Sequence, residues 1–298
     1  MGELLKTLEE KRLLVADGAW GTLLQAHGLP AGTCPEIWNV EEPDKVRSVA
    51  AAYAQAGSDL VLTNTFGGST LALRRHGLAD RTEELNAAGA RLSLEGAPEK
   101  LVAASVGPTG EFLPPMGEVT EAEMRAAFAA QVRAVLKAGV RILCIETMTS
   151  VEEAVCAVRA AREVAAELSA EVDVMATMTF TETPKGYRTF MGVDCPSAVE
   201  KLTDAGADVL GSNCGNGIEQ MVPIALEFRR ISDKPILIQA NAGLPQIEKG
   251  VTVFRQSPEH MARWVPQLVE AGVSIVGGCC GTTPEHIRQI RSQIDRLL

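Results

Sequence analysis

Eight short apolar runs, rich in residues that favour strands, recur along the chain and alternate with stretches of helix-forming residues. The runs are residues 13–16, 60–63, 101–104, 142–145, 174–177, 209–210, 236–239 and 274–276. Between them lie stretches rich in Ala, Leu, Glu and Arg, for example residues 121–138 and 151–168. This alternation predicts a parallel sheet covered by helices on its outer face. Eight such units in 298 residues predict an α/β fold, a single (β/α)8 TIM barrel that forms one domain over residues 1–298.

An Ala-Gly dipeptide precedes every second run and supports the count of eight. The dipeptides are residues 56–57, 138–139, 205–206 and 271–272, just ahead of the second, fourth, sixth and eighth runs. Glycine there fits the left-handed residue that ends a helix and turns the chain into the next strand. An open, doubly wound sheet is the alternative fold. Since no Gly-x-Gly-x-x-Gly follows the first run, the dinucleotide-binding version of that fold is disfavoured.

The charge of the chain argues against some classes of partner. Its formal net charge is −10, whereas nucleic acids and anionic membranes require dense basic surfaces. The sequence has no apolar stretch long enough to span a membrane, and its charged first residues do not resemble a signal peptide. We therefore expect a cytoplasmic enzyme of small-molecule metabolism. In that reducing compartment its seven cysteines are expected to be thiols or metal ligands rather than disulfides.

Glycines and polar residues follow every predicted strand, at the end of the barrel where such folds carry their active sites. The segments are residues 17–21, 64–67, 106–110, 146–147, 179–182, 213–216, 241–245 and 278–281. Three cysteines are among them, Cys214 after the sixth strand and Cys279 and Cys280 after the eighth. Three thiolates without an obvious fourth protein ligand predict a zinc site with one open position, as in catalytic zinc centres.

The adjacent cysteines place a condition on this prediction. Successive residues of a regular strand point to opposite faces, so Cys279 and Cys280 can share a metal only if the backbone leaves strand geometry. Gly277, Gly278 and Gly281 give the backbone that freedom. The alternatives for the pair are a vicinal disulfide or two small buried apolar side chains.

The remaining cysteines and the histidines are weaker candidates for the site. We expect Cys144 and Cys156 in the core, and Cys34 and Cys195, which precede prolines, in loops. The histidines fall in predicted helices or connections away from the rim; they are His27, His76, His260 and His286.

Two carboxylates, Asp17 and Glu146, each end an apolar strand, where a charge is costly without a cationic partner. In a glycosidase-like enzyme they would be the general acid and base. In a zinc-thiolate enzyme they would hold a substrate ammonium group. A structural alternative is that they accept hydrogen bonds from loop amides.

These motifs resemble the homocysteine S-methyltransferase family, whose members are zinc-dependent (β/α)8 barrels. The resembling segments cover nearly the whole chain and are residues 17–22, 63–67, 86–89, 105–110, 145–147, 213–215 and 277–282. Within the family, residues 105–110 and 241–245 most resemble the homocysteine-binding module of cobalamin-dependent methionine synthase. Thr147 stands where the betaine-dependent branch has a tyrosine that approaches the metal, which disfavours betaine as donor.

The resemblance implies that Cys214, Cys279 and Cys280 are the zinc ligands and that Asn241 fills the fourth position before substrate arrives. A thiol at pH 7 is mostly protonated, and coordination to zinc deprotonates it. The homocysteine sulfur would therefore reach the zinc as a thiolate and attack a methyl group, giving methionine.

The resemblance also implies how the substrate is held. Asp17 and Glu146 would bind the homocysteine amino group, and the backbone amides of Gly18 and Ala19 would receive its carboxylate.

The methyl donor is the part of the reaction that these residues do not supply. The sequence carries neither an Asp-x-His-x-x-Gly corrinoid signature nor the length of a second, folate-binding barrel. We therefore expect methylcobalamin on a separate corrinoid protein that docks at the barrel mouth. S-methylmethionine or S-adenosylmethionine is the alternative donor, and another thiol is the alternative acceptor. Two other classes are a metal-assisted lyase, which would favour His and carboxylate ligands, and an idle barrel that serves as a partner-binding or thiol-sensing subunit.

Overall fold

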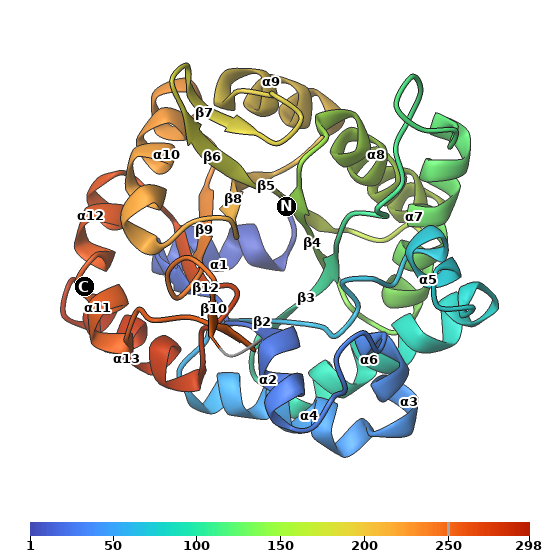
Figure 1. Cartoon of the computed structure of the whole chain (residues 1–298), viewed down its shortest axis with the longest axis horizontal. Coiled ribbons are helices and arrows are strands. Elements are labelled where there is room, and N and C mark those ends of the chain that lie inside the picture. The colour runs from blue at the N-terminus through green and yellow to red at the C-terminus, as the bar shows by residue number, and fades with distance from the viewer. Residues whose placement is uncertain (249–250) are drawn as a thin grey trace.

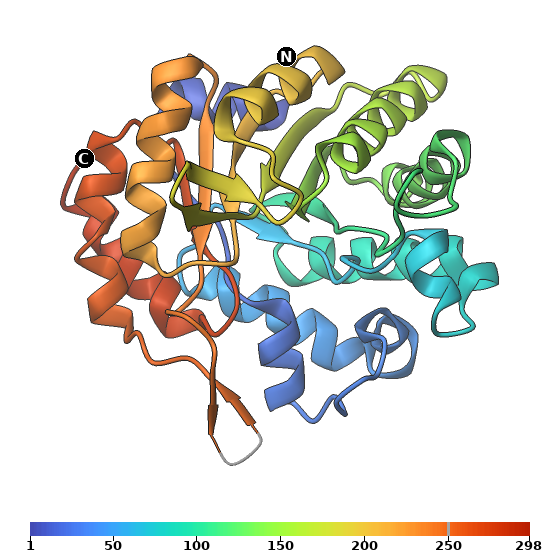
Figure 2. The same ribbon diagram turned by 45° about the horizontal axis from the view of Figure 1, so that its top comes forward.

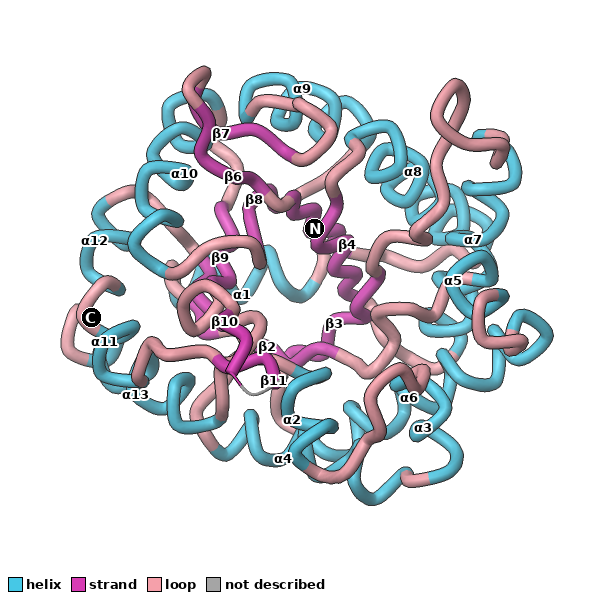
Figure 3. The backbone as a smooth tube through the Cα atoms, in the orientation of Figure 1, coloured by secondary structure: helices cyan, strands magenta, loops and turns pink. Residues whose placement is uncertain are grey.

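The computed structural model describes residues 1–248 and 251–298, and the eight predicted strands form a ring within helices (Figures 1 and 3). The strands of the ring are β1 (Leu14–Val15), β2 (Leu60–Leu62), β3 (Leu101–Val106), β4 (Ile142–Met148), β5 (Asp173–Met178), β8 (Val209–Asn213), β9 (Ile236–Ala240) and β12 (Ile275–Gly278). Neighbours pair in parallel in the order β1-β12-β9-β8-β5-β4-β3-β2. A parallel bridge between Ala16 and Leu60 joins β1 to β2. The predicted (β/α)8 barrel is confirmed.

Apart from α1, which precedes β1, the helices follow the strands along the chain and cover the outside of the ring. They are α1 (Glu3–Lys11), α2 (Trp20–Ala26), η1 (Pro35–Ile37), α3 (Trp38–Glu41), α4 (Pro43–Gln55), α5 (Thr70–Arg74), η2 (Ala79–Arg81), α6 (Thr82–Gly96), α7 (Glu121–Lys137), α8 (Val151–Glu167), α9 (Cys195–Ala205), α10 (Ile218–Ile231), α11 (Pro258–Ala262), α12 (Val265–Glu270) and α13 (Pro284–Asp295). None of the helices within the described residues is long and apolar enough to cross a bilayer.

The glycines of the Ala-Gly dipeptides adopt the predicted left-handed conformation. Their φ angles are 100° at Gly57, 109° at Gly139, 108° at Gly206 and 85° at Gly272. Side chains disfavour this region of backbone space, which explains the choice of glycine. Each dipeptide therefore turns the chain from a helix into the strand that follows it.

Two apolar layers hold the barrel together. The outer layer lies between strands and helices, and it includes Cys156 on α8 and Cys195, the first residue of α9. Cys195 therefore starts a helix and is buried, so the prediction of a loop there was wrong. The inner layer fills the ring itself and includes Cys144 of β4, as predicted for a core residue. Leu4 and Leu8 of α1 belong to this inner layer.

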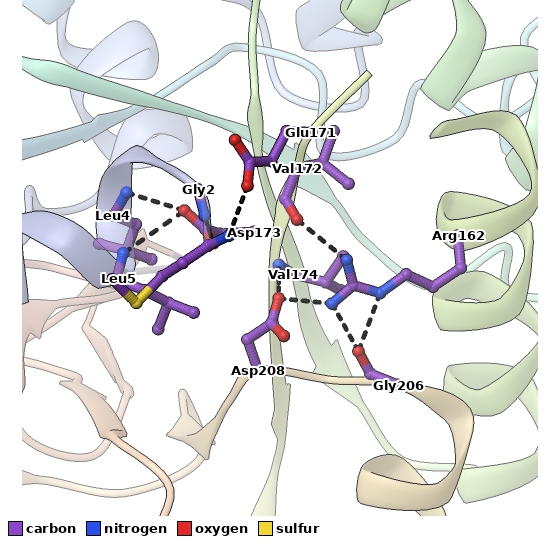
Figure 4. Close-up of polar contacts among 11 residues, drawn as sticks. Gly2, Leu4, Leu5, Arg162, Glu171, Val172, Asp173, Val174, Gly206 and Asp208 are labelled. Carbon is purple, nitrogen blue, oxygen red and sulfur yellow. Dashed lines mark hydrogen bonds and ion pairs between the residues drawn. The ribbon is translucent and has the colours of Figure 1, made fainter. Parts of the chain in front are cut away.

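Helix α1 closes the amino-terminal end of the barrel, where β5 begins with Asp173 (Figure 4). The Asp173 carboxylate accepts hydrogen bonds from the backbone amides of Gly2 at 3.1 Å, Leu4 at 2.8 Å and Leu5 at 3.4 Å. A carboxylate at this position satisfies amides that have no partner within the helix and interacts favourably with its dipole. Asp173 thus holds α1 in place across the amino-terminal end of the ring.

Beside this contact, Arg162 of α8 ties the start of the next strand to the barrel (Figure 4). Its guanidinium donates to the carbonyl oxygens of Gly206 and Val172 and to the carboxylate of Asp208 at 2.5 Å. Asp208 in turn accepts from the backbone amide of Val174 at 2.8 Å.

Two antiparallel hairpins interrupt the βα repeat, and the strand pattern did not predict either of them. The first, β6 (Phe180–Thr183) and β7 (Gly186–Thr189), follows β5. The second, β10 (Gln246–Glu248) and β11 (Val251–Val253), follows β9. Figure 2 shows the second hairpin projecting from the body of the molecule. Since both come after the carboxyl ends of barrel strands, they extend the rim that carries the predicted site.

Candidate active site

A cavity of about 500 Å³ lies at the carboxyl-terminal ends of the strands. Six of the predicted site residues line it, namely Gly18, Ala19, Glu146, Cys214, Cys279 and Cys280. The other two, Asp17 and Asn241, are not among the lining residues; they are 0% and 3% exposed. The fold therefore brings together loops from opposite ends of the sequence, as the rim prediction required.

The three cysteines form one cluster, and their sulfur atoms lie within 4.8 Å of one another. The sulfur atoms of Cys214 and Cys280 are 3.8 Å apart. Tetrahedral zinc with Zn–S bonds of about 2.3 Å separates two thiolate ligands by about 3.8 Å, so this spacing fits zinc. All seven cysteines are free thiols, which agrees with a ligand set and not with a vicinal disulfide.

The backbone leaves strand geometry at the paired cysteines, as the metal prediction demands. Strand β12 ends at Gly278, so Cys279 and Cys280 lie outside it, and Gly281 turns the chain with a φ of 80°. Gly277 and Gly278 still belong to the strand, and their role is to give space. A Cβ on Gly278 would lie 2.3 Å from the Thr282 hydroxyl, so no larger residue fits there.

The protons of the cluster are unevenly shared. Hydrogen bonds from Cys279 and Cys280 lower the pKa of the Cys214 thiol, and donation to Cys214 raises the pKa of the other two. The Asn241 side chain also contributes a hydrogen bond that lowers the pKa of Cys214. The buried Oδ1 of Asn241 has no hydrogen-bond partner among the described residues. A thiolate-rich pocket next to an unpaired amide oxygen is a donor set that suits a divalent cation.

Glu146 faces this cluster from strand β4 and is 6% exposed. Burial raises the pKa of its carboxyl group to about 7. The Ser105 hydroxyl donates to one carboxylate oxygen at 2.5 Å, and Asn213 Nδ2 donates to the other at 3.2 Å. Such a carboxylate, buried without a cationic partner among the described residues, is suited to a substrate ammonium group.

Asp17 makes the hydrogen bonds expected of a structural carboxylate. Its Oδ2 accepts from the backbone amide of Leu62 at 2.7 Å and from the indole of Trp20 at 2.8 Å. Its Oδ1 has no hydrogen-bond partner among the described residues. Burial, helped by the nearby charge of Glu146, raises the pKa of Asp17 to about 7. Asp17 thus orients Trp20, which lines the cavity, and keeps one oxygen unpaired.

The two amides predicted to receive a carboxylate are not equivalent. The Ala19 amide donates to the hydroxyl of Thr282 at 3.0 Å. The Gly18 amide makes no hydrogen bond within the described residues. A Cβ on Gly18 would lie 2.7 Å from the same hydroxyl and 3.0 Å from the Tyr53 ring, which explains the glycine. The amide of Gly18 is therefore the one that a ligand can engage without displacing a bond.

The sequence missed several side chains that line the cavity. His76 was expected away from the rim, but it lines the cavity beside Arg75, just past α5, so that prediction was wrong. Cys34 and Glu36 also line it, and the Cys34 thiol donates to Glu36 at 3.0 Å. The signal for Arg75 and His76 was their position soon after the second strand. No periodicity marked Cys34, because the segment before η1 is irregular.

Comparison with known proteins identifies the family. A family model described as homocysteine S-methyltransferase matches residues 14–294. The chain belongs to the homocysteine S-methyltransferase family.

Relatives within the homocysteine S-methyltransferase family include much longer proteins. Methionine synthase of Mycobacterium tuberculosis is 30% identical over 309 aligned residues, which cover 99% of this chain and 26% of that protein. Methionine synthase of Mycobacterium leprae is also 30% identical, and the alignment covers 99% of this chain and 25% of that protein. The chain thus spans about a quarter of the length of these curated relatives.

The barrel is also similar to solved structures of about its own length. The metallated form of the homocysteine methyltransferase MmuM from Escherichia coli superposes with a TM-score of 0.79 at 23% identity, covering 97% of this chain and 99% of that chain. The oxidized form of the same protein gives a TM-score of 0.77 at 24% identity. This likeness supports the fold.

Proposed function

We propose that this chain transfers a methyl group to the sulfur of homocysteine, giving methionine, with residues 1–298 acting as one cytoplasmic domain. The observation that carries the proposal is the cluster of Cys214, Cys279 and Cys280 at the cavity, with sulfur atoms within 4.8 Å of one another. We further propose that these thiolates hold a zinc ion and that the Oδ1 of Asn241 fills the fourth position before substrate binds.

Cys214, Cys279 and Cys280 would hold the zinc ion, which would lower the pKa of the substrate thiol and so supply a sulfur that is nucleophilic at neutral pH. The thiol proton leaves to solvent as the substrate binds. The S–CH₃ bond then forms as the bond between the methyl group and its donor breaks, and the electron pair of that bond stays with the donor. This step needs no general base at the moment of transfer.

The other residues of the site position the amino acid part of the substrate. Glu146 receives the ammonium group, and the cation keeps the carboxylate charged despite the burial that raises its pKa to about 7. The unpaired Oδ1 of Asp17 gives the ammonium group a second acceptor once the side chains adjust. The free amide of Gly18 receives the substrate carboxylate, joined by that of Ala19 if Thr282 yields its bond.

For the methyl donor we propose methylcobalamin carried by a separate corrinoid protein. The curated relatives are named methionine synthase, and this chain matches a quarter of their length. A cavity of about 500 Å³ accommodates homocysteine but not a corrinoid cofactor, which would have to approach from the mouth. Exposed apolar side chains in the segments that follow β2, β3, β5 and β9, hairpins included, offer a docking surface there; they are Phe66, Phe112, Met116, Phe190, Leu244 and Ile247.

Metal analysis followed by a donor screen tests the proposal. The purified protein should contain about one zinc per chain. It should form methionine from homocysteine and methylcobalamin, free or on a corrinoid protein, and not from betaine. Methionine formed from S-methylmethionine or S-adenosylmethionine would instead identify a small donor. Zinc without methyl transfer from any donor would indicate another acceptor thiol or an idle, thiol-sensing barrel.

A further inference from the structure

The amide side chain of Asn213 contacts both the Glu146 carboxylate and the thiol cluster. Asn213 is the last residue of β8 and is 0% exposed. Its Nδ2 lies 3.2 Å from Glu146 Oε2 and 3.9 Å from the sulfur of Cys279. A single rigid amide group thus contacts both of the side chains that would hold the two ends of an amino acid thiol.

Asn213 also fixes an unusual backbone conformation in β4. Thr147 has a φ of 61°, which is rare for a β-branched residue, and the pairing of β4 with β5 shifts register between Ile145 and Met148. Asn213 accepts from the Thr147 amide at 2.8 Å and donates to the Thr147 hydroxyl at 2.7 Å. Irregularities of this kind re-aim side chains near active sites. The irregularity includes Glu146, so the same amide that contacts its carboxylate also holds its backbone.

The orientation of the Asn213 amide is fully determined by its neighbours. Its Oδ1 accepts from the Thr147 amide and from the hydroxyl of Thr177 at 2.7 Å, a residue of β5. Since β5 lies between β4 and β8, this one side chain connects three adjacent strands. Every group that faces Oδ1 is a donor, which leaves Nδ2 to face Glu146 and the sulfur of Cys279.

We propose that Asn213 is a positioning residue that sets the acceptor specificity of the site, by holding the Glu146 carboxylate at a fixed separation from the thiol cluster. The inference rests on the proposed function. Because of Asn213, the site would prefer a thiol whose amino group lies at the same distance from the sulfur as in homocysteine. A thiol of equal length without an amino group would bind less tightly.

Binding to the zinc-loaded protein tests this role without a methyl donor. Calorimetry measures the affinities of homocysteine and of 4-mercaptobutanoate, which lacks only the amino group, for the unmodified protein, Asn213→Ser and Glu146→Gln. Asn213→Ser should lower the affinity for homocysteine by about tenfold or more, the loss expected when a hydrogen bond to a charged group is removed. The affinity for 4-mercaptobutanoate should fall by less than about twofold. The losses from Asn213→Ser and Glu146→Gln should not add, because both act on the same ammonium contact.

The matched control is Thr179→Val, which removes a hydroxyl that donates to the backbone oxygen of Asn213 and leaves its side chain in place. It should change neither affinity by more than about twofold. Asn213→Asp keeps the shape of the side chain but puts an oxygen toward Glu146, and it carries the test if Asn213→Ser does not fold. An equal loss of affinity for both thiols, or a loss of zinc with the preference for homocysteine unchanged, would overturn the inference. If the unmodified protein bound neither thiol, the proposed function would fail instead.

Discussion

Two residues with left-handed backbones, Thr147 and Cys214, stand at the centre of the site. Their φ angles are 61° and 60°, and neither is glycine. Such conformations cost on the order of 1–3 kcal/mol each and persist where the surrounding structure imposes them. At Thr147 the amide of Asn213 supplies that constraint, and Cys214 lies next to Asn213 in the chain. The residues that meet the proposed substrate are therefore held in place by the fold before any ligand arrives.

Replacing Cys214 with alanine should abolish metal binding. Only two thiolates remain in Cys214→Ala. Because loss of a residue that merely hydrogen-bonds to a metal ligand costs about 10- to 100-fold in affinity, loss of the ligand itself should lower zinc affinity by more than about 100-fold. Zinc content measured by mass spectrometry should drop to near zero, and methionine formation with it. Cys156→Ala, which removes a buried thiol of α8 far from the cluster, is the control and should keep the metal. Full zinc and full activity in Cys214→Ala would refute the metal site.

Replacing Asp17 with asparagine should change how stability depends on pH. Burial raises the pKa of Asp17 from 3.8 to about 7. The native state therefore keeps the proton to higher pH than the unfolded chain, and this stabilisation, complete below pH about 4, is lost as the pH rises to 7. Asp17→Asn cannot lose a proton. Between pH 5 and the folded pKa of about 7 lie about two pH units of about 1.36 kcal/mol each, so its free energy of unfolding relative to the unmodified protein should rise by at most about 3 kcal/mol between pH 5 and pH 8.

Urea unfolding of the metal-free proteins at the two pH values measures this difference. Asp204→Asn, at an exposed position, is the control and should show no such rise. A difference in free energy between Asp17→Asn and the unmodified protein that is the same at pH 5 and pH 8 would contradict the prediction.

At the scale of elements, the sequence predicts what is encoded locally. The eight barrel strands are apolar on both faces, and glycines such as Gly139 mark where helices end, so their positions follow from single segments. The hairpins β6–β7 and β10–β11 are mostly polar and exposed, and each forms a two-stranded sheet of its own outside the barrel. The apolar pattern of the sequence therefore does not reveal them.

The candidate site divides in the same way. The rim positions of Cys214 and Cys279 follow from the ends of predicted strands. The hydrogen bond from Asn213 to Glu146 joins residues 67 positions apart. The Oδ2 of Asp17, which was expected to meet the substrate, accepts a hydrogen bond from the backbone amide of Leu62. Such contacts depend on how the strands are arranged around the ring, which no local pattern specifies. His76 was misplaced for the same reason.

The contact between Asp173 and α1 should be the main tie that holds this helix across the barrel (Figure 4). Asp173→Ala leaves three backbone amides without their acceptor, and the free energy of unfolding should fall by about 1–3 kcal/mol. Hydrogen exchange of the α1 amides should accelerate more than exchange in the barrel strands. Asp204→Ala, at an exposed position on α9 away from α1, is the control and should cost less than about 0.5 kcal/mol. Unchanged exchange in α1 would show that apolar packing of Leu4 and Leu8 alone holds the helix.

At the scale of the whole molecule, the two ends of the barrel differ in kind. The amino-terminal end is closed by α1 and by buried polar contacts. The opposite end carries the cavity, both hairpins and six of the large apolar side chains that the described residues expose. Exposed apolar groups around a cavity are typical of protein interaction sites. The asymmetry is what the proposed transfer of a methyl group from a partner protein requires, since that partner would dock at one end only.

Substitutions on this rim should separate docking from chemistry. Phe190 and Ile247 are 86% and 81% exposed; Phe190 directly follows β7, and Ile247 lies in β10. The double variant Phe190→Ser, Ile247→Ser should lower kcat/KM for methylcobalamin on a corrinoid protein by about tenfold or more, because two apolar contacts are lost. With free methylcobalamin, kcat/KM should change by less than about twofold, since neither side chain lines the cavity. Leu226→Ser, at an exposed apolar position on α10, is the control and should change neither value. An equal fall in kcat/KM with free and with protein-bound methylcobalamin would refute a docking role. It would show that these side chains affect the methyl transfer itself or the folding of the site.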